Sequence, residues 1–253
     1  MDRLKKIIQI RKDLKNNLVS LGSWMQIPNS SVAEIIGQAG YDWVAVDLEH
    51  GSMEIHQLPD LFRSLELGDT LPLARLAEGT EKDCKQALDA GAGGVIVPMI
   101  ENAEQLEKVR KYCCWPPSGK RGVGFSRANL YGKHFSDYSE EAQSPLLIAM
   151  IESSNAVDNL QDILQVDGLD AILIGPYDLS ASMGLTGKFS NPNFVHVLNK
   201  IASLSLSANI PYGIHVVEPS TENLKLRINE GYKFIAYSLD SVFLNKSVVR
   251  PSL

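Results

Sequence analysis

The stretch Ala171-Ile-Leu-Ile-Gly-Pro-Tyr-Asp-Leu-Ser180 decides the fold. Its four opening apolar residues show no alternation with polar ones, which is typical of a parallel strand buried on both faces. The strand ends at Gly175-Pro176, and one acid, Asp178, follows its carboxyl end. In α/β folds ligands bind at this end of the sheet, because the loops there are free to carry chemistry. Asp178 is therefore a candidate metal ligand or general base, or else the N-cap of a helix from Leu179 onward.

The same alternation of strand and helix recurs along the chain. After an amphipathic helix over residues 3–16, the predicted strands cover residues 18–25, 43–47, 71–75, 94–98, 146–151, 171–174, 211–215 and 234–238. The predicted helices behind them cover residues 31–38, 57–67, 81–90, 103–113, 156–164, 194–208, 222–230 and 241 onward. Eight such units predict one α/β domain over residues 1–253, a (β/α)8 TIM barrel with an N-terminal extra helix. A doubly wound open sheet is the alternative, but no Gly-x-Gly-x-x-Gly motif follows the first strand.

One segment interrupts this pattern. Residues 115–144 are rich in Gly, Ser, Arg and aromatic residues and have little sustained periodicity. They predict a long loop after the fourth strand, and long loops in compact domains are usually functional or mobile. We expect Phe125 and Ser126, in this loop, to reach the barrel mouth.

Composition narrows the class of protein. The 24 basic and 30 acidic residues give a net charge of −6, which argues against a nucleic-acid or anionic-membrane partner. No apolar run is long enough to span a membrane, and the N-terminus has no signal-peptide core. Cys84, Cys113 and Cys114 suit neither a disulfide framework nor a zinc site, so they are predicted to be free thiols. We therefore expect a cytoplasmic protein without a membrane partner.

Polar residues stand at the carboxyl ends of several predicted strands. They are Asp47, His50, Arg75, Glu152, Asp178 and His215. On a barrel these positions converge on one mouth. Glu152 and Asp178 are two oxygen donors on neighbouring strands, which favours octahedral Mg²⁺ or Mn²⁺, completed by water and substrate, over zinc. The alternative is that each acid caps a helix or pairs with an arginine.

His50 and Arg75 add a candidate base and a candidate anion site. An imidazole ordinarily titrates near neutrality, and Asp47 and Glu49 are near enough in sequence to orient or charge it. The alternative for His50 is a solvated loop position. Arg75 lies among apolar residues and needs an anionic partner, either Asp47 or Asp89 in a structural salt bridge or a bound carboxylate.

Lysine placement bears on the type of enolate chemistry. A Schiff-base mechanism needs a desolvated lysine inside the barrel or at its mouth. The predicted strands one to seven contain none, and Lys233 precedes the eighth strand, at the opposite end. Enolate chemistry in this barrel is therefore expected to be metal-assisted.

Six motifs occur in order between residues 18 and 240. They are Val46-Asp-Leu-Glu-His-Gly51, Pro72 to Arg75, Val97-Pro-Met99, Pro116-Pro117 with Arg121-Gly-Val-Gly124, Ile151-Glu152, and Gly175-Pro-Tyr-Asp-Leu-Ser-Ala-Ser-Met-Gly184. Together they resemble the HpcH/HpaI aldolase family, the metal-dependent class II pyruvate aldolases. The resemblance implies reversible cleavage of a 4-hydroxy-2-oxo acid, of the 2-keto-3-deoxy sugar acid type, into pyruvate and an aldehyde.

The resemblance also implies roles for individual residues. Glu152 and Asp178 would hold the divalent metal, Mg²⁺ or Mn²⁺ with Co²⁺ as a further candidate, which chelates the keto acid. His50 would act as the base, helped by Asp47 or Asp89. Arg75 would stabilise the pyruvate enolate.

Further residues are implied to contact substrate. The segment Gly175 to Asp178 would offer backbone N–H groups to the pyruvate carboxylate, with Pro176, which has no N–H, as a further residue against the substrate. Trp24 matches an aromatic residue of the family near the site. Tyr177 departs from relatives, which often carry a small residue there, and would narrow the mouth. By their places at a strand end and in the long loop, Phe125, Ser126 and His215 are candidates to face the aldehyde half. His215 and Ser126 could bond hydroxyl groups, which favours a polyhydroxylated acceptor; the alternative is that His215 bonds its own loop and does not meet substrate.

Three wider expectations complete the interpretation. Similar proteins are usually homo-oligomers, hexamers built as trimers of dimers, with the last helix exchanged between neighbours. A second enzymatic alternative is a lyase of the citrate-lyase β type acting on CoA thioesters, which the acidic charge balance disfavours. The remaining alternative is a non-catalytic barrel that binds a metal or keto acid.

Overall fold

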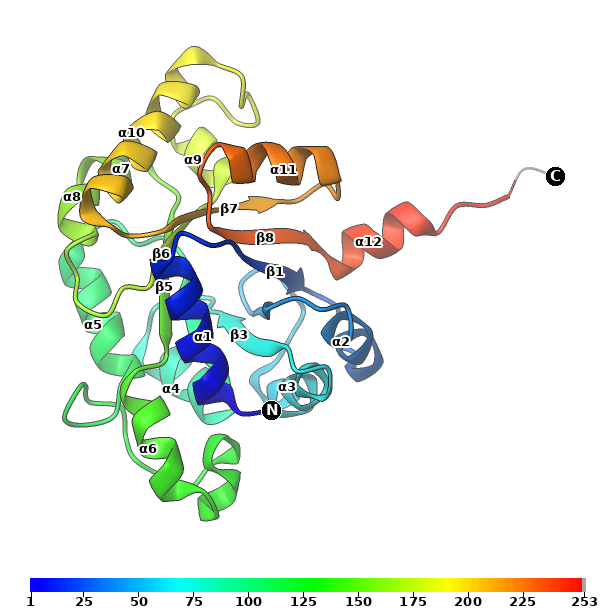
Figure 1. Ribbon diagram of the computed structural model, residues 1–253, viewed down its shortest axis with the longest axis vertical. Coiled ribbons are helices and arrows are strands. Elements are labelled where there is room, and N and C mark those ends of the chain that lie inside the picture. Colours follow the sequence, from blue (N-terminus) through cyan, green and yellow to red (C-terminus); the bar gives the residue numbers. More distant parts are fainter. Residues whose placement is uncertain (252–253) are drawn as a thin grey trace.

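Eight parallel strands form the centre of the molecule (Figure 1). The computed structural model describes residues 1–251, so the end of the predicted domain at Leu253 lies outside it. The strands pair in sequence order, and β8 pairs with β1 to close the barrel. The predicted (β/α)8 fold is confirmed.

The observed elements follow the predicted ones closely. The strands are β1 Ser20–Met25, β2 Trp43–Asp47, β3 Leu71–Arg75, β4 Gly94–Val97, β5 Leu146–Ile151, β6 Ala171–Ile174, β7 Tyr212–Val216 and β8 Phe234–Leu239. The α-helices are α1 Arg3–Lys15, α2 Ser30–Gly37, α3 Leu58–Leu67, α4 Glu81–Asp89, α5 Ala103–Cys113, α6 Phe135–Gln143, α7 Ser154–Asp158, α8 Leu160–Ile163, α9 Pro176–Ser182, α10 Pro192–Ala208, α11 Thr221–Asn229 and α12 Asp240–Ser247. Two 3₁₀ segments are η1 Ile55–Gln57 and η2 Arg127–Gly132.

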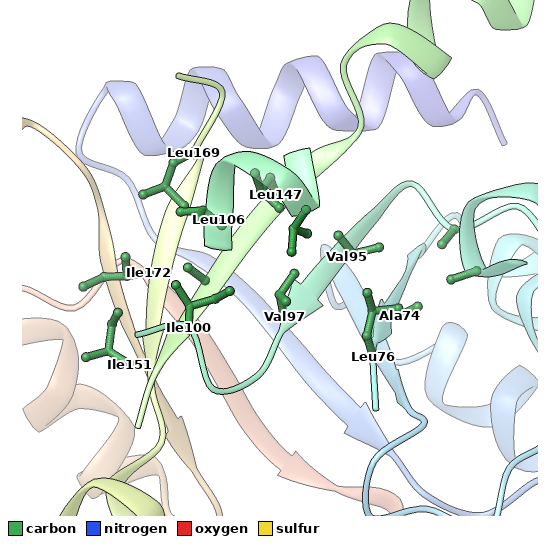
Figure 2. Packing of buried hydrophobic residues seen from close by; sticks show 14 of the residues in the cluster. Ala74, Leu76, Val95, Val97, Ile100, Leu106, Leu147, Ile151, Leu169 and Ile172 are labelled. Carbon is green, nitrogen blue, oxygen red and sulfur yellow. The ribbon is translucent and has the colours of Figure 1, made fainter. Parts of the chain in front are cut away.

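The larger apolar cluster lies between the strands and the helices that cover them. Figure 2 shows Val97 and Ile172 on two strands beside Ile100 and Leu106 of the connecting segment and helix α5. These side chains are fully buried. Each buried side chain of this size contributes roughly 1.5–3 kcal/mol relative to an exposed one. This layer fixes the strands whose carboxyl ends form the mouth.

A second apolar cluster fills the inside of the barrel and closes its base. Ile7 and Ile10 of α1 join Trp43 and Phe234, whose rings stack with centroids 4.3 Å apart. Gly22 leaves the space for this stack, because a Cβ there would lie 2.1 Å from the Trp43 ring. Since α1 and these rings fill the amino-terminal end, the carboxyl end is left for a site.

The segment 115–144 is not the long mouth loop that its composition predicts. It contains η2 and α6, and Tyr138 and Ala142 of α6 pack with Trp115 in a small apolar cluster. The segment follows α5 and leads into β5, so it lies at the base of the barrel, where α6 contacts α1. Only connections that follow a strand face the mouth of a (β/α)8 barrel. The spacing of Phe135, Tyr138 and Ala142 is the helical signal that the loop interpretation overlooked.

Two other expectations can be compared with the structure. The three cysteines are free and buried. Within residues 1–251 no helix has both the length and the apolar character needed to cross a lipid bilayer. Helix α12 projects away from the barrel at the end of the described chain (Figure 1).

Candidate active site

The carboxyl ends of the strands enclose a cavity of about 380 Å³, the mouth cavity. Ten of the predicted site residues line it: Trp24, Asp47, His50, Arg75, Glu152, Gly175, Pro176, Tyr177, Asp178 and His215. They come from β1, β2, β3, β5, β6 and β7 or from the connections that follow them. The barrel therefore brings together positions that lie almost two hundred residues apart in sequence.

Asp47 is the hub of the hydrogen bonds in the mouth cavity. Its Oδ1 accepts bonds from the backbone N–H groups of Glu49 and His50, at 3.0 and 3.1 Å, and from Arg75 at 3.0 Å. Its Oδ2 accepts bonds from Trp24 at 3.1 Å and from a glutamine side chain at 2.9 Å. Burial raises the pKa of Asp47, but Arg75 and these donors outweigh it and hold the pKa below its ordinary value. Asp47 is thus a fixed anion that orients its neighbours.

Arg75 is buried and binds two carboxylates. Its guanidinium pairs with Asp47 at 3.0 Å and also with Glu49, so the structural salt bridge expected from sequence is present with Asp47 and absent with Asp89. Its Nε–H has no hydrogen-bond partner among residues 1–251 and is itself buried. A buried donor without a partner costs about 1–3 kcal/mol. Arg75 also lines the mouth cavity, so its positive charge lies at the cavity wall.

One carboxylate oxygen of Glu152 accepts a hydrogen bond, and the other lies beside the backbone of Gly175, directly after β6. The N–H of Met99 donates to Oε2 at 2.9 Å from a backbone with a φ of 51°. A Cβ at Gly175 would lie 2.5 Å from Oε1, so only glycine permits this close approach. Burial raises the pKa of Glu152, the Met99 N–H and Arg75 oppose that shift, and Asp178 adds to it.

Asp178 does not cap a helix. Helix α9 begins at Pro176 with Gly175 as its N-cap, and Asp178 lies in the first turn with an exposed side chain. The backbone N–H groups around Asp178 have no intrahelical acceptors, because the N–H groups in the first turn of a helix have no preceding turn to donate to. The helix-cap alternative for Asp178 is thereby ruled out, and that for Glu152 fails as well because Ser153 is the N-cap of α7.

The donor set suits a hard divalent cation. Glu152 and Asp178 line the same cavity from neighbouring strands, and their charges are close enough for Asp178 to raise the Glu152 pKa. Across the described chain, no three or more His, Cys, Asp or Glu side chains are grouped to enclose a metal. Two carboxylates with open positions match Mg²⁺ or Mn²⁺, which retain waters and bind substrate oxygens, rather than a closed structural zinc site.

The two histidines of the mouth cavity differ in environment. His50 is exposed on the loop after β2, and its backbone N–H is bound by Asp47. His215 is partly buried, and its ring stacks on Trp24 with centroids 5.1 Å apart. Burial lowers the pKa of His215 to about 4, although Ser238 and Asp47 oppose the shift. His50 is therefore the histidine that is accessible for proton transfer.

Asp89, Phe125 and Ser126 do not reach the mouth cavity of their own chain. Asp89 is the last residue of α4 and pairs with Arg121 at 2.8 Å. Arg127, next to Ser126, bonds the carbonyl of Ala90 and pairs with a glutamate at the end of α3. All three predicted residues thus lie at the base, because Asp89 ends helix α4 and Phe125 and Ser126 follow helix α5. The expectation that Phe125 and Ser126 reach the mouth of their own barrel is wrong.

Two residues of the site were not predicted. Gln26, directly after β1, donates its Nε2 to Asp47 at 2.9 Å, and its backbone N–H is held by Asp240. Its position just past a strand end was the available signal. Met99 lies two residues after β4 and donates its backbone N–H to Glu152. Residue type does not reveal a backbone contact of this kind.

Residues 20–247 match the family model described as HpcH/HpaI aldolase/citrate lyase. The chain is 34% identical to "Hydroxypyruvate/pyruvate aldolase" of Roseobacter denitrificans over 92% of this chain and 91% of the relative. It is 33% identical to "2-keto-3-deoxy-L-rhamnonate aldolase" of Klebsiella pneumoniae over 95% of this chain and 90% of the relative. A crystal structure of a family protein from Burkholderia cenocepacia superposes with a TM-score of 0.88 at 27% identity, covering 94% and 95% of the two chains. The chain belongs to the HpcH/HpaI aldolase/citrate lyase family, a family of carbon–carbon lyases.

Proposed function

We propose that this protein is a metal-dependent aldolase that reversibly cleaves a 4-hydroxy-2-oxo acid into pyruvate and an aldehyde. The observation that carries the proposal is the arrangement of Glu152, Asp178, Arg75 and His50 around one cavity. Relatives named as pyruvate and 2-keto-3-deoxy sugar acid aldolases support the same reaction class. Its small-molecule partners are a keto acid and an aldehyde.

Cleavage requires a base for the C4 hydroxyl proton and stabilisation of the enolate that forms. A divalent ion held by Glu152 and Asp178 would supply positive charge next to the keto oxygen. Arg75 lines the same cavity, and its positive charge can stabilise an enolate or carboxylate oxygen. The residues at which α9 begins, Gly175 to Asp178, line the same cavity, and backbone N–H groups in the first turn of a helix suit a carboxylate such as that of pyruvate.

His50 is the proposed base, and Asp47 its positioning residue. Asp47 bonds the backbone N–H of His50 and fixes the loop that carries the imidazole. The imidazole itself is exposed and lines the cavity, so it can reach a substrate hydroxyl. Trp24 and Tyr177 form walls of the cavity, and Tyr177 is 54% exposed, which is consistent with a position where substrate enters.

A lysine-based mechanism has no support in this cavity. Among the described residues that line it, none is a lysine. A Schiff base with the keto acid would need a lysine, so we propose that a metal and Arg75 stabilise the negative charge of the enolate. A CoA-thioester lyase is the second candidate. The phosphates of CoA would be repelled by Asp47, Glu152 and Asp178 in the mouth cavity, where Arg75 is already paired.

The decisive experiment measures pyruvate release from a panel of 4-hydroxy-2-oxo acids, after chelation and after addition of Mg²⁺, Mn²⁺ or Co²⁺. We expect turnover only with metal. Release that persists after chelation would contradict the metal assignment. Turnover of a hydroxyacyl-CoA in place of the keto acids would favour the citrate-lyase type, and pyruvate binding without any turnover would favour a non-catalytic barrel.

We further propose that the protein is a homo-oligomer, a hexamer formed as a trimer of dimers through exchange of the last helix. Helix α12 projects from the barrel (Figure 1), and Leu244 on it is 55% exposed. An apolar groove of about 430 Å³ lies between α12 and α2. Any role of Asp89, Phe125 or Ser126 in the reaction would have to be exerted on the mouth of a neighbouring chain, since they lie at the base of their own.

A further inference from the structure

Strand β8 contains a bulge next to the mouth cavity. Gly22 pairs with Ala236, but Trp24 pairs with Leu239, so Tyr237 and Ser238 together lie opposite the single residue Ser23. Ser238 has a φ of 52°, in the left-handed region that residues other than glycine rarely adopt. Bulges of this kind re-aim backbone groups, and strained backbone is retained where the surrounding structure requires it.

The bulge directs the Ser238 carbonyl at the imidazole of His215. The distance from the carbonyl oxygen to Nε2 is 3.1 Å. A carbonyl oxygen can only accept, so Nε2 must carry the hydrogen, and the neutral ring is left with a lone pair on Nδ1. Nδ1 has no hydrogen-bond partner among residues 1–251, and it is not among their sealed, unpartnered polar atoms. His215 is thus an acceptor held ready.

Stacking fixes the plane of the same ring. His215 lies against Trp24 with an interplanar angle of 26°, and the indole N–H of Trp24 is bound by Asp47. The imidazole therefore has its tautomer set by Ser238 and its plane set by Trp24. A ring oriented in this way can recognise a donor at low entropic cost, because few rotamers are lost on binding.

His215 lies where the mouth cavity meets a second cavity of about 510 Å³ between α10 and α11. Both cavities are lined by Pro176, Tyr177, His215 and Val217. The charged groups that face His215 are Asp47 and Arg75, which pair with each other. The second cavity is also lined by Arg227, which pairs with Glu230.

We propose that Nδ1 of His215 accepts a hydrogen bond from a hydroxyl group on the aldehyde half of the substrate. The inference rests on the proposed aldolase function and adds a specificity-determining residue for its acceptor, a hydroxyaldehyde. A purely aliphatic aldehyde leaves Nδ1 without a donor and is therefore disfavoured relative to a hydroxyaldehyde.

The first measurement separates this inference from the proposed function. Deuterium exchange at C3 of pyruvate in D₂O, with Mn²⁺, reports enolate formation by the wild-type protein without any aldehyde. Absence of exchange would contradict the aldolase proposal itself. Where exchange occurs, the acceptor preference is then measured as kcat/KM for addition of pyruvate to glyceraldehyde and to propanal.

The variants keep or remove the acceptor atom. His215→Phe keeps a ring for Trp24 but has no acceptor, and we expect its preference for glyceraldehyde over propanal to fall about tenfold, the scale of one hydrogen bond. His215→Gln retains an acceptor and is expected to keep an intermediate preference. His196→Phe makes the same change at an exposed position of α10 and should leave the preference unaltered.

Two outcomes would overturn the inference. An unchanged preference in His215→Phe would show that no hydrogen bond to substrate is made. Equal losses in His215→Phe and His215→Gln would assign the effect to packing.

Discussion

Glu152 and Asp178 illustrate how two similar side chains acquire one proposed role from different surroundings. Glu152 is 3% exposed and held by the Met99 N–H, whereas Asp178 is exposed in the first turn of α9. The buried acid is costly unless a cation or proton compensates it, and the exposed acid gives access to solvent. The pair can therefore bind a metal tightly on one side and leave positions for water and substrate on the other.

Replacing either acid tests the metal site. We expect Glu152→Gln and Asp178→Asn to abolish both cleavage and Mn²⁺ binding, since each removes a charged ligand while keeping the side-chain volume. Calorimetric titration with Mn²⁺ measures the binding, and Asp162→Asn on the exposed face of α8 is the matched control. Undiminished Mn²⁺ affinity in both variants would remove these residues from the metal site.

Replacing His50 tests the base. His50→Ala should lower turnover by roughly 10²–10⁴, the usual effect of losing a general base, with Mn²⁺ binding retained. His56→Ala, an exposed histidine in η1, should leave turnover unchanged. A His50→Ala rate within threefold of wild type would show that another group takes the proton.

His215 is expected to make stability depend on pH. Because burial lowers its pKa to about 4, the unfolded chain binds a proton between about pH 6.5 and 4 that the folded chain does not. Stability of the wild type should therefore fall on acidification across this range, by at most about 3 kcal/mol from this group. Asp47 and Arg75 face the ring and oppose each other.

Urea unfolding of wild type and His215→Phe at a series of pH values isolates this contribution. The free energy of unfolding of the wild type minus that of His215→Phe should decrease as the pH falls from 6.5 to 4, because only the wild type carries the buried imidazole. A difference that is constant with pH would mean that the ring is protonated as easily in the folded protein as in the unfolded chain.

At the scale of elements, ion pairs attach the segment 115–144 to the base of the barrel. The Arg121 side chain is 0% exposed and joins Asp89 at 2.8 Å and Tyr138 Oη at 3.0 Å. Its guanidinium lies over the rings of both Trp115 and Tyr138. Arg127 bonds the end of α4, and Arg3 of α1 pairs with α6. A segment without a strand of its own is thus held by charges that reach the neighbouring helices.

Removing one of these arginines should destabilise the fold without affecting the mouth cavity. Arg121→Met leaves Asp89 and Tyr138 without their partner, and we expect a loss of about 1–3 kcal/mol in the free energy of unfolding. Arg63→Met, at an exposed pair with Asp60, should change stability by less than about 0.5 kcal/mol. Urea midpoints measure both, and equal midpoints for the two variants would contradict the attachment.

At the scale of the whole molecule, α12 and α2 present the apolar groove that we assign to an interface. Ile35 is 72% exposed and Leu244 is 55% exposed on its two sides. Leu244→Lys should lower the molar mass in light scattering, because a buried lysine at an interface is costly. Leu206→Lys, exposed on α10, is the control. A wild-type protein that is already monomeric would contradict the oligomer.

Much of the site followed from the sequence because strand order alone fixes one end of a barrel. Runs such as residues 171–174 predicted buried parallel strands, and each acid, histidine or arginine directly after such a run had to face the mouth. Asp47, Arg75, Glu152 and Asp178 were therefore placed correctly before any tertiary contact was known. Phe125 and Ser126 were misplaced because the segment that carries them follows a helix.

Local pattern determined which residues share the mouth, since the period and polarity of a strand are encoded within a few neighbours. Only the tertiary structure decided how they act on one another. The hydrogen bonds to Asp47 from Trp24, Gln26 and Arg75, and the bond from the Met99 N–H to Glu152, join residues of different strands or of the connections that follow them. The tautomer of His215 depends on a bulge in β8 that no residue type in the sequence indicates. Such contacts depend on backbone positions to within an ångström, and these exist only once all eight strands have closed the barrel.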